Sequence, residues 1–152
     1  MTRAIRGGEM CAIARTVDAL KDPWGFLIVR EALAGVTRFA DFRANLAIAT
    51  DVLTDRLNAL VDAGILRREQ YQEPGRRARA SYHLTDAGAE LKIVIGALQQ
   101  WGDEHLPVEC GPTIVRRDHR TGGPVEIAFV NANGRRIDPD EADFVRTPAY
   151  PE

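Results

Sequence analysis

Apolar side chains recur at helical spacing through the first two thirds of the chain. The first predicted helix, 11–20, places three of them on one face: Ile13, Val17 and Leu20. Asp22 and Pro23 are a strong signal for a second helix start. An Asp side chain accepts hydrogen bonds from free backbone N–H groups, and proline suits the first turn. The helix that follows, 24–34, is apolar almost all round, which predicts the buried centre of the fold.

Two shorter helices are predicted next. Gly35 ends the central helix, because glycine adopts the left-handed conformation at little cost. Thr37 then caps a helix over 38–45, which buries Phe39, Phe42 and Leu46. A helix over 50–63 has an inner stripe formed by Leu53, Leu57 and Leu60. Its outer face is polar and carries Asp51, Thr54, Asp55, Asn58 and Asp62.

A hairpin and a long helix complete this region. Segments 65–71 and 79–84 have the composition of strands, and the tip between them, 73–77, contains a Pro-Gly turn and two arginines. Thr85 is predicted to cap a helix that continues to His105. Its apolar face is broader than a single small domain would need to cover, which favours a partner surface.

The last third of the chain has a different composition. Prolines punctuate it, so it reads as short strands and turns rather than helices. We place a domain boundary at Leu106 and Pro107, which gives a domain over 1–106 and a β-rich extension over 107–152. Within the extension, a hairpin is predicted from 125–130 to 136–137 around Asn133-Gly134.

Composition and charge then limit the function classes. Apolar residues make up 45% and charged residues 28%, as in ordinary globular proteins. The net charge of −2 argues against purely electrostatic binding of nucleic acid. Cys11 and Cys110 are too few for a disulfide framework, and no apolar run could span a bilayer or serve as a signal peptide. We therefore expect a cytoplasmic protein without a membrane partner.

Two short helices followed by a basic hairpin predict a winged helix-turn-helix. The fold class is mainly α with a small β-hairpin wing, plus the β-rich C-terminal extension. In this design the second short helix enters the major groove of double-stranded DNA. Residues 67–79 contain five arginines against two glutamates, and guanidinium groups match phosphate geometry. The alternative is a solvated hairpin whose arginines only keep its edge soluble. We favour phosphate contact.

The ordered motifs resemble those of HxlR-type transcriptional regulators and cover about residues 10–106. They are Cys11-Ala12-Ile13-Ala14-Arg15, Trp24, Leu27-Ile28-Val29-Arg30-Glu31-Ala32-Leu33, Arg38-Phe39-Ala40-Asp41-Phe42-Arg43, Leu53-Thr54-Asp55-Arg56-Leu57, Ala63-Gly64-Ile65-Leu66, Tyr82-His83-Leu84-Thr85-Asp86-Ala87-Gly88 and Trp101-Gly102. The resemblance implies a bacterial, sequence-specific DNA-binding regulator. It also implies a homodimer whose interface is formed by the first and last helices.

The expected DNA contacts fall into three groups. Asp51, Thr54, Asp55 and Asn58 face the base edges, with Thr50 near the helix N-terminus. Arg38, Arg43 and Arg56 contact the DNA backbone, and the wing residues are Arg76, Arg77 and Arg79.

The predicted recognition helix departs from the family pattern. Ala49 occupies the cap position where Ser or Thr is usual, although Thr50 could take over with a shift of one residue. Asp51 and Asp55 stand where amides are usual. A carboxylate is repelled by phosphate, but it can accept a hydrogen bond from the N4 amine of cytosine. We therefore expect either weaker, more salt-sensitive DNA binding or an unusual operator.

Two candidate effector sites accompany the DNA-binding residues. Cys11 lies where some family members carry a sensing cysteine, and a helix N-terminus favours a thiolate that reacts with electrophiles. The alternative, which we favour, is a small apolar residue packed against the dimer partner. Trp24 and Trp101 are more typical of core anchors, although an apolar dimer groove between them could hold a small aromatic effector.

Metal, cofactor and catalytic roles have little support in the sequence. His83, His105 and His119 are scattered and form no zinc ligand set. Some relatives carry a zinc ribbon after the domain; here Gly122, Val130 and Asn133 stand at the positions of its cysteines. We expect no metal, no cofactor and no enzymatic activity. The alternative function is a dimeric small-molecule-binding or protein-interaction module on the same scaffold.

Overall fold

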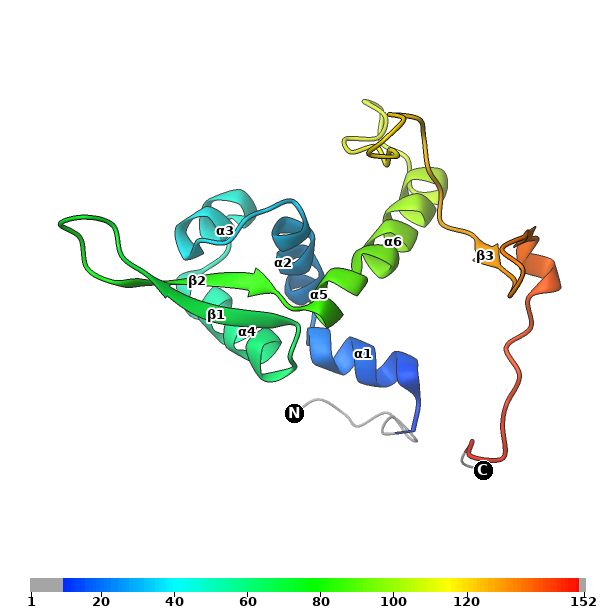
Figure 1. Cartoon of the computed structure of the whole chain (residues 1–152), viewed down its shortest axis with the longest axis horizontal. Helices are drawn as coiled ribbons and strands as arrows, with labels where there is room; N and C mark the ends of the chain where they lie inside the picture. Colours follow the sequence, from blue (N-terminus) through cyan, green and yellow to red (C-terminus); the bar gives the residue numbers. More distant parts are fainter. Residues whose placement is uncertain (1–9, 151–152) are drawn as a thin grey trace. The chain divides into compact units, whose positions relative to one another are not determined.

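The computed structural model describes residues 10–150 of the chain. It divides into two compact units, Met1–Lys92 and Ile93–Glu152 (Figure 1). Along the chain the helices and strands are α1 (Ala12–Leu20), α2 (Pro23–Leu33), α3 (Phe39–Leu46), α4 (Thr50–Asp62), β1 (Leu66–Tyr71), β2 (Arg79–Leu84), α5 (Asp86–Glu90), α6 (Lys92–His105), β3 (Phe129–Val130), β4 (Arg136–Ile137) and the 3-10 helix η1 (Pro139–Glu141). Within the described range no helix is long and apolar enough to cross a membrane.

The core of the first unit lies where α2, α3 and α4 meet. The predicted start of α2 is confirmed, because the Asp22 carboxylate accepts a hydrogen bond from the backbone N–H of Trp24 at 3.0 Å. Gly35 follows this helix with a φ of 95°, a conformation that favours glycine. The side chains of Ile28, Val29, Phe42, Leu53 and Leu57 are completely buried, as the helical spacing predicts.

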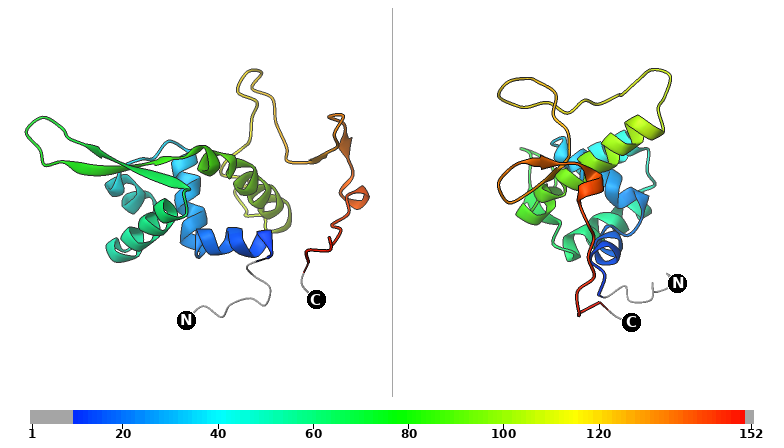
Figure 2. Two further views of the ribbon diagram at one scale, coloured as in Figure 1. Left: turned by 60° about the horizontal axis from the view of Figure 1, so that its bottom comes forward. Right: turned by 90° about the vertical axis from the view of Figure 1, so that its right-hand side faces the viewer.

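The wing is the hairpin formed by β1 and β2 with the connecting loop 72–78. The strands are antiparallel, with Leu66 opposite Leu84 and Tyr71 opposite Arg79. Figures 1 and 2 show that the loop extends beyond the helices of the unit. The hairpin buries Leu66 at the start of β1 and the adjacent residues Ser81 and Tyr82 on β2, whereas residues 67–70 are exposed.

The prediction that Thr37 caps α3 is wrong. Arg38 occupies the N-cap position, and no side chain caps this helix. The carbonyl of Thr37 accepts a hydrogen bond from the backbone N–H of Tyr82 at 2.8 Å, and Arg38 forms a β-bridge with Ser81. The residues just before α3 are therefore joined to β2 by a single β-bridge.

The long helix predicted from Thr85 to His105 is divided in two. Its cap is confirmed, since the Thr85 hydroxyl accepts a hydrogen bond from the N–H of Gly88 at 3.0 Å. The helix is interrupted at Leu91, whose N–H reaches only as far back as the carbonyl of Gly88. The first unit ends at Lys92, the first residue of α6, whereas the domain boundary at Leu106 and Pro107 stays a prediction.

The C-terminal hairpin is shorter than the sequence predicts. Phe129 pairs with Ile137 and Val130 with Arg136, and Gly134 takes a φ of 76° in the turn. The ladder does not extend back to Val125, because both backbone groups of Ile127 bond to the side chain of Gln100. The predicted fold class is confirmed: helices predominate, and the first unit carries an antiparallel hairpin.

Candidate DNA-binding interface

A tight turn sets α4 against α3. Ala47 takes a left-handed φ of 49°, and Ala49 is the N-cap residue of α4, so the alternative start at Thr50 is not adopted. Alanine offers no side-chain acceptor, which leaves the first N–H groups of α4 free to bind an anion. Leu53, Leu57 and Leu60 face the core. The opposite face is exposed and presents the predicted reading residues Asp51, Thr54, Asp55 and Asn58, with Thr50 at its start.

The exposed face of α4 is acidic. Asp51 and Asp55 lie on it, and within the described residues neither carboxylate forms an ion pair. The Thr54 hydroxyl donates to the carbonyl of Thr50 at 2.8 Å, and the oxygen keeps the capacity to accept. This face can therefore accept hydrogen bonds from base amines, but it repels phosphate.

Four exposed arginines around the helices and the wing have no ion pair in the described part of the chain. They are Arg43 on α3, Arg68 on β1, Arg77 in the wing loop and Arg79 at the start of β2. Arg68 is absent from the residues expected from sequence. The arginine-rich composition of residues 67–79 is the signal that could have found it, and the strand register places it opposite Tyr82. Arg68 and Arg79 line an open hollow of about 390 Å³ next to Phe39. Their charges are available to phosphate.

Arg38 and Arg76 share one carboxylate at the base of the wing loop. Arg38 lies 3.1 Å from one oxygen of Glu73, and Arg76 lies 3.6 Å from the other. The guanidinium of Arg38 also stacks over the ring of Tyr71, with its central carbon 5.1 Å from the ring centroid. Both arginines are more than half exposed. They are therefore held in place while remaining accessible to a ligand.

Arg56 is engaged inside the protein. Its guanidinium contacts the Asp22 carboxylate at 2.5 and 2.7 Å, and the same carboxylate caps α2. The hydrogen bond from Arg56 lowers the pKa of Asp22. The contact ties α4 to the start of α2. Arg56 would have to break it in order to bind the DNA backbone in the way the sequence suggests.

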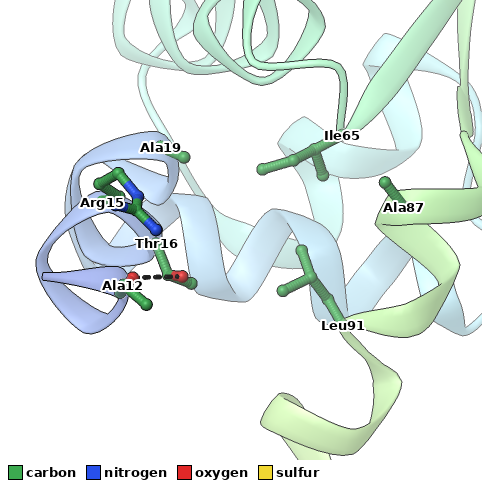
Figure 3. Close-up of a pocket in the computed structure, with 7 residues that line it drawn as sticks. All are labelled: Ala12, Arg15, Thr16, Ala19, Ile65, Ala87 and Leu91. Atoms are coloured by element: carbon green, nitrogen blue, oxygen red, sulfur yellow. Dashed lines mark hydrogen bonds between the residues drawn. The ribbon is translucent and has the colours of Figure 1, made fainter. Parts of the chain in front are cut away.

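A second hollow, of about 290 Å³, lies beside α1 (Figure 3). Ala12, Arg15, Thr16 and Ala19 line it from α1, and Ile65, Ala87 and Leu91 line it from the opposite side. Cys11 is the N-cap residue of α1 and is half-buried, which is compatible with either of the roles expected for it. Trp24 is half-buried on α2, and Trp101 is exposed on α6 in the second unit.

The part of the chain that the structure describes holds no metal-ligating group of three or more His, Cys, Asp or Glu residues. In the extension, the Asp118 carboxylate accepts hydrogen bonds from the N–H groups of Arg120 and Thr121. These bonds lower the pKa of Asp118. Gly122 takes a φ of 69° in the same turn, and its N–H donates to the carbonyl of Asp118 at 2.8 Å.

An α3–turn–α4 unit followed by a hairpin with accessible arginines defines a winged helix-turn-helix, DNA-binding transcription regulator. The chain belongs to the HxlR-like helix-turn-helix family, whose pattern matches residues 19–110. An uncharacterized HTH-type transcriptional regulator of Mycobacterium tuberculosis is 40% identical over 111 residues, which are 73% of this chain and 69% of that protein. An uncharacterized HTH-type transcriptional regulator of Synechocystis is 34% identical over 103 residues, which are 67% of this chain and 75% of that protein. The expected family is confirmed.

Solved structures support the same fold. PA1607, described as a candidate transcription factor, matches with a TM-score of 0.79 at 27% identity over 93% of this chain and 99% of its own. PA1374 of Pseudomonas aeruginosa matches with a TM-score of 0.64 at 34% identity, over 93% of this chain and 96% of its own. The redox regulator HypR in its reduced form matches with a TM-score of 0.57 at 26% identity, over 63% and 94%. The first two likenesses include the C-terminal extension.

Proposed function

We propose that this regulator binds a specific operator as a homodimer, with α4 in the major groove and the wing on the DNA backbone. The observation that carries the proposal is the combination, on one unit, of an exposed polar face of α4 and exposed arginines, four of which have no ion pair among the described residues. Asp51, Thr54, Asp55 and Asn58 would read bases, with Thr50 at the helix start. Arg38, Arg43, Arg68, Arg76, Arg77 and Arg79 would contact phosphates.

The homodimer is supported by apolar side chains at both expected helices. Ile13 and Val17 on α1 are exposed, and so are Ile93, Leu98 and Trp101 on α6. Exposed apolar surface of this extent is typical of protein interfaces. A twofold dimer of winged helices would read two half-sites about 34 Å apart, one turn of DNA.

The chemistry of α4 indicates which bases it could read. A carboxylate accepts hydrogen bonds and donates none, so Asp51 or Asp55 would select the N4 amine of cytosine. The free N–H groups at the start of α4 would bind a neighbouring phosphate and hold the helix in the groove. The two acidic residues would therefore reduce non-specific affinity while favouring particular base pairs.

The test is a selection of bound fragments from the genome that encodes the chain, followed by fluorescence anisotropy of the best fragment and a scrambled duplex. We expect enrichment of a palindromic sequence whose binding survives moderate salt, while binding to the scrambled duplex is lost. No enriched sequence, with equal and salt-sensitive binding to both duplexes, would instead favour the small-molecule or protein-interaction module. Cys11 remains a candidate thiol sensor, and the redox regulator HypR among the similar structures makes oxidant treatment a useful arm of this assay.

A further inference from the structure

The hollow between α3 and the wing contains a polar group that the protein itself does not use. Tyr82 lines this hollow and is only 6% exposed. Its backbone N–H donates to the carbonyl of Thr37, but its hydroxyl makes no hydrogen bond within the described residues. A hydroxyl that is largely removed from water is ordinarily hydrogen-bonded, because leaving it without a partner costs free energy. A molecule bound in the hollow could supply the missing partner.

A free guanidinium group lies next to this hydroxyl. Arg68 stands directly opposite Tyr82 in the strand register, so the two side chains lie on the same face of the hairpin, with Cβ atoms about 5 Å apart. Arg68 is exposed, lines the same hollow, and has no ion pair or side-chain hydrogen bond in the part of the chain that is described. A guanidinium and a hydroxyl at this spacing can both donate to one carboxylate.

The walls of the hollow favour a flat apolar body beside that anion. Phe39 lines it from α3 and Tyr71 from β1, whereas the small side chains of Ala40 and Ala80 leave space between them. The volume of about 390 Å³ falls within the range of roughly 300–1,000 Å³ that is usual for small-molecule pockets. The β-bridge between the segment before α3 and β2 holds the two walls together. The hollow is therefore formed before any ligand arrives.

The charges around the hollow also favour an anion. Arg79 lines it as well, is exposed, and has no ion pair among the described residues. It stands three positions from Tyr82 on β2, roughly 10 Å along the strand. The nearest acidic residues in sequence, Asp41, Glu69 and Glu73, do not line the hollow, and both glutamates are paired with other arginines, at 2.8 and 3.1 Å. The two arginines of the hollow are therefore uncompensated.

We propose that this hollow is a binding site for a small aromatic carboxylate. Arg68 and Tyr82 bind the carboxylate, the aromatic ring lies against Phe39, and Arg79 attracts a second anionic group at the other end. Inorganic phosphate would satisfy the arginines but would leave the apolar wall uncovered. The combination of charge and aromatic lining therefore selects an organic anion.

Such a ligand would also control DNA binding. Arg68 and Arg79 are among the arginines proposed to contact phosphates, and a guanidinium that binds a ligand carboxylate is no longer available to a DNA phosphate. The ligand and the operator therefore compete, and each weakens the binding of the other by the same factor. This consequence rests on the proposed function, whereas the binding site itself does not.

The test measures binding of terephthalate, which carries a carboxylate at each end of one ring, to the full chain by isothermal titration calorimetry without DNA. We expect one molecule to bind per chain, with a dissociation constant that rises about tenfold in Y82F and at least tenfold in R68A. Y82F keeps the buried ring and should fold normally. The matched control is R67A, which removes the same charge from the neighbouring residue on the other face of β1 and should leave the constant unchanged.

Two further ligands test the chemistry of the site. Cyclohexane dicarboxylate has the same charges without a flat ring and should bind several-fold more weakly than terephthalate, and inorganic phosphate should bind at least tenfold more weakly. Equal affinity for terephthalate and either of these ligands would overturn the inference. So would the absence of saturable terephthalate binding, or an equal loss of affinity in R67A and R68A.

Fluorescence anisotropy on the selected operator tests the competition with DNA. Saturating terephthalate should weaken DNA binding by the unmodified chain, and the same concentration should have little effect on Y82F. Unchanged DNA affinity in the presence of bound terephthalate would refute the competition and leave the site in place. If no operator is found, the proposed function fails while the calorimetry still decides whether the site exists.

Discussion

Replacing the two unpaired wing arginines, R77A/R79A, should weaken DNA binding by an amount that the structure allows us to estimate. Neither side chain is in an ion pair within the described residues, so each guanidinium is available to neutralise one phosphate. Each phosphate contact contributes about 0.9 to the slope of log K against log salt. The double variant should lower that slope by about 1.8, which corresponds to roughly 60-fold weaker binding at 0.1 M salt.

The measurement is fluorescence anisotropy on the selected operator and on a scrambled duplex, each at several salt concentrations. The loss should be similar for both duplexes, because phosphate contacts carry no base sequence. R67A is the matched control, since Arg67 contacts Glu69 at 2.8 Å and the carbonyl of Leu84 at 2.8 Å. It should change the slope little. An unchanged slope in R77A/R79A would remove the wing from the interface.

Two further substitutions test the acidic positions. D22N keeps a good helix cap but loses the ion pair with Arg56, so it should lower the free energy of unfolding by about 1 kcal/mol near neutral pH. The pKa of Asp22 is lowered in the folded state, so this contribution is present above the unfolded pKa and lost as pH falls through the folded value. Urea unfolding should show the two proteins converging in acid, and a constant difference would contradict this cause. If Asp51 only repels phosphate, D51N should raise the affinity for every DNA duplex several-fold. If Asp51 reads a base, D51N should instead relax the preference at one base pair. Fluorescence anisotropy against a set of duplexes with single-base changes separates the two outcomes.

Local signals predicted the first unit well. Asp22 and Pro23 begin α2 as expected, and the leucine stripe of α4 faces the core. The exposed polar face of α4 follows from the same periodicity, because buried and exposed positions alternate with the helical repeat. Helix starts and buried helix faces could be predicted because they depend on residues within one or two helical turns of each other.

The predictions failed where a partner lies far along the chain. Thr37 has the side chain of a cap, but its carbonyl pairs with Tyr82, which is remote in sequence. Nothing near Arg56 in the sequence indicates its ion pair with the distant Asp22, whereas its expected contact with the DNA backbone stays a prediction. The apolar spacing continues through Leu91, so nothing local marks the break between α5 and α6. The predicted strand over 125–130 is shorter in the structure, because the backbone N–H of Ile127 donates to the side chain of Gln100 on α6.

The pairing of Thr37 and Arg38 with β2 has a consequence for how operators can diverge. The segment that leads into α3 is hydrogen-bonded to β2, so the helix-turn-helix and the wing are connected directly through the backbone. In the proposed binding mode, this connection would keep constant the distance along DNA between the base pairs that α4 reads and the phosphates that the wing contacts. Relatives with the same pairing could exchange residues on α4 to change which bases they prefer, but a different half-site length would require rebuilding the sheet.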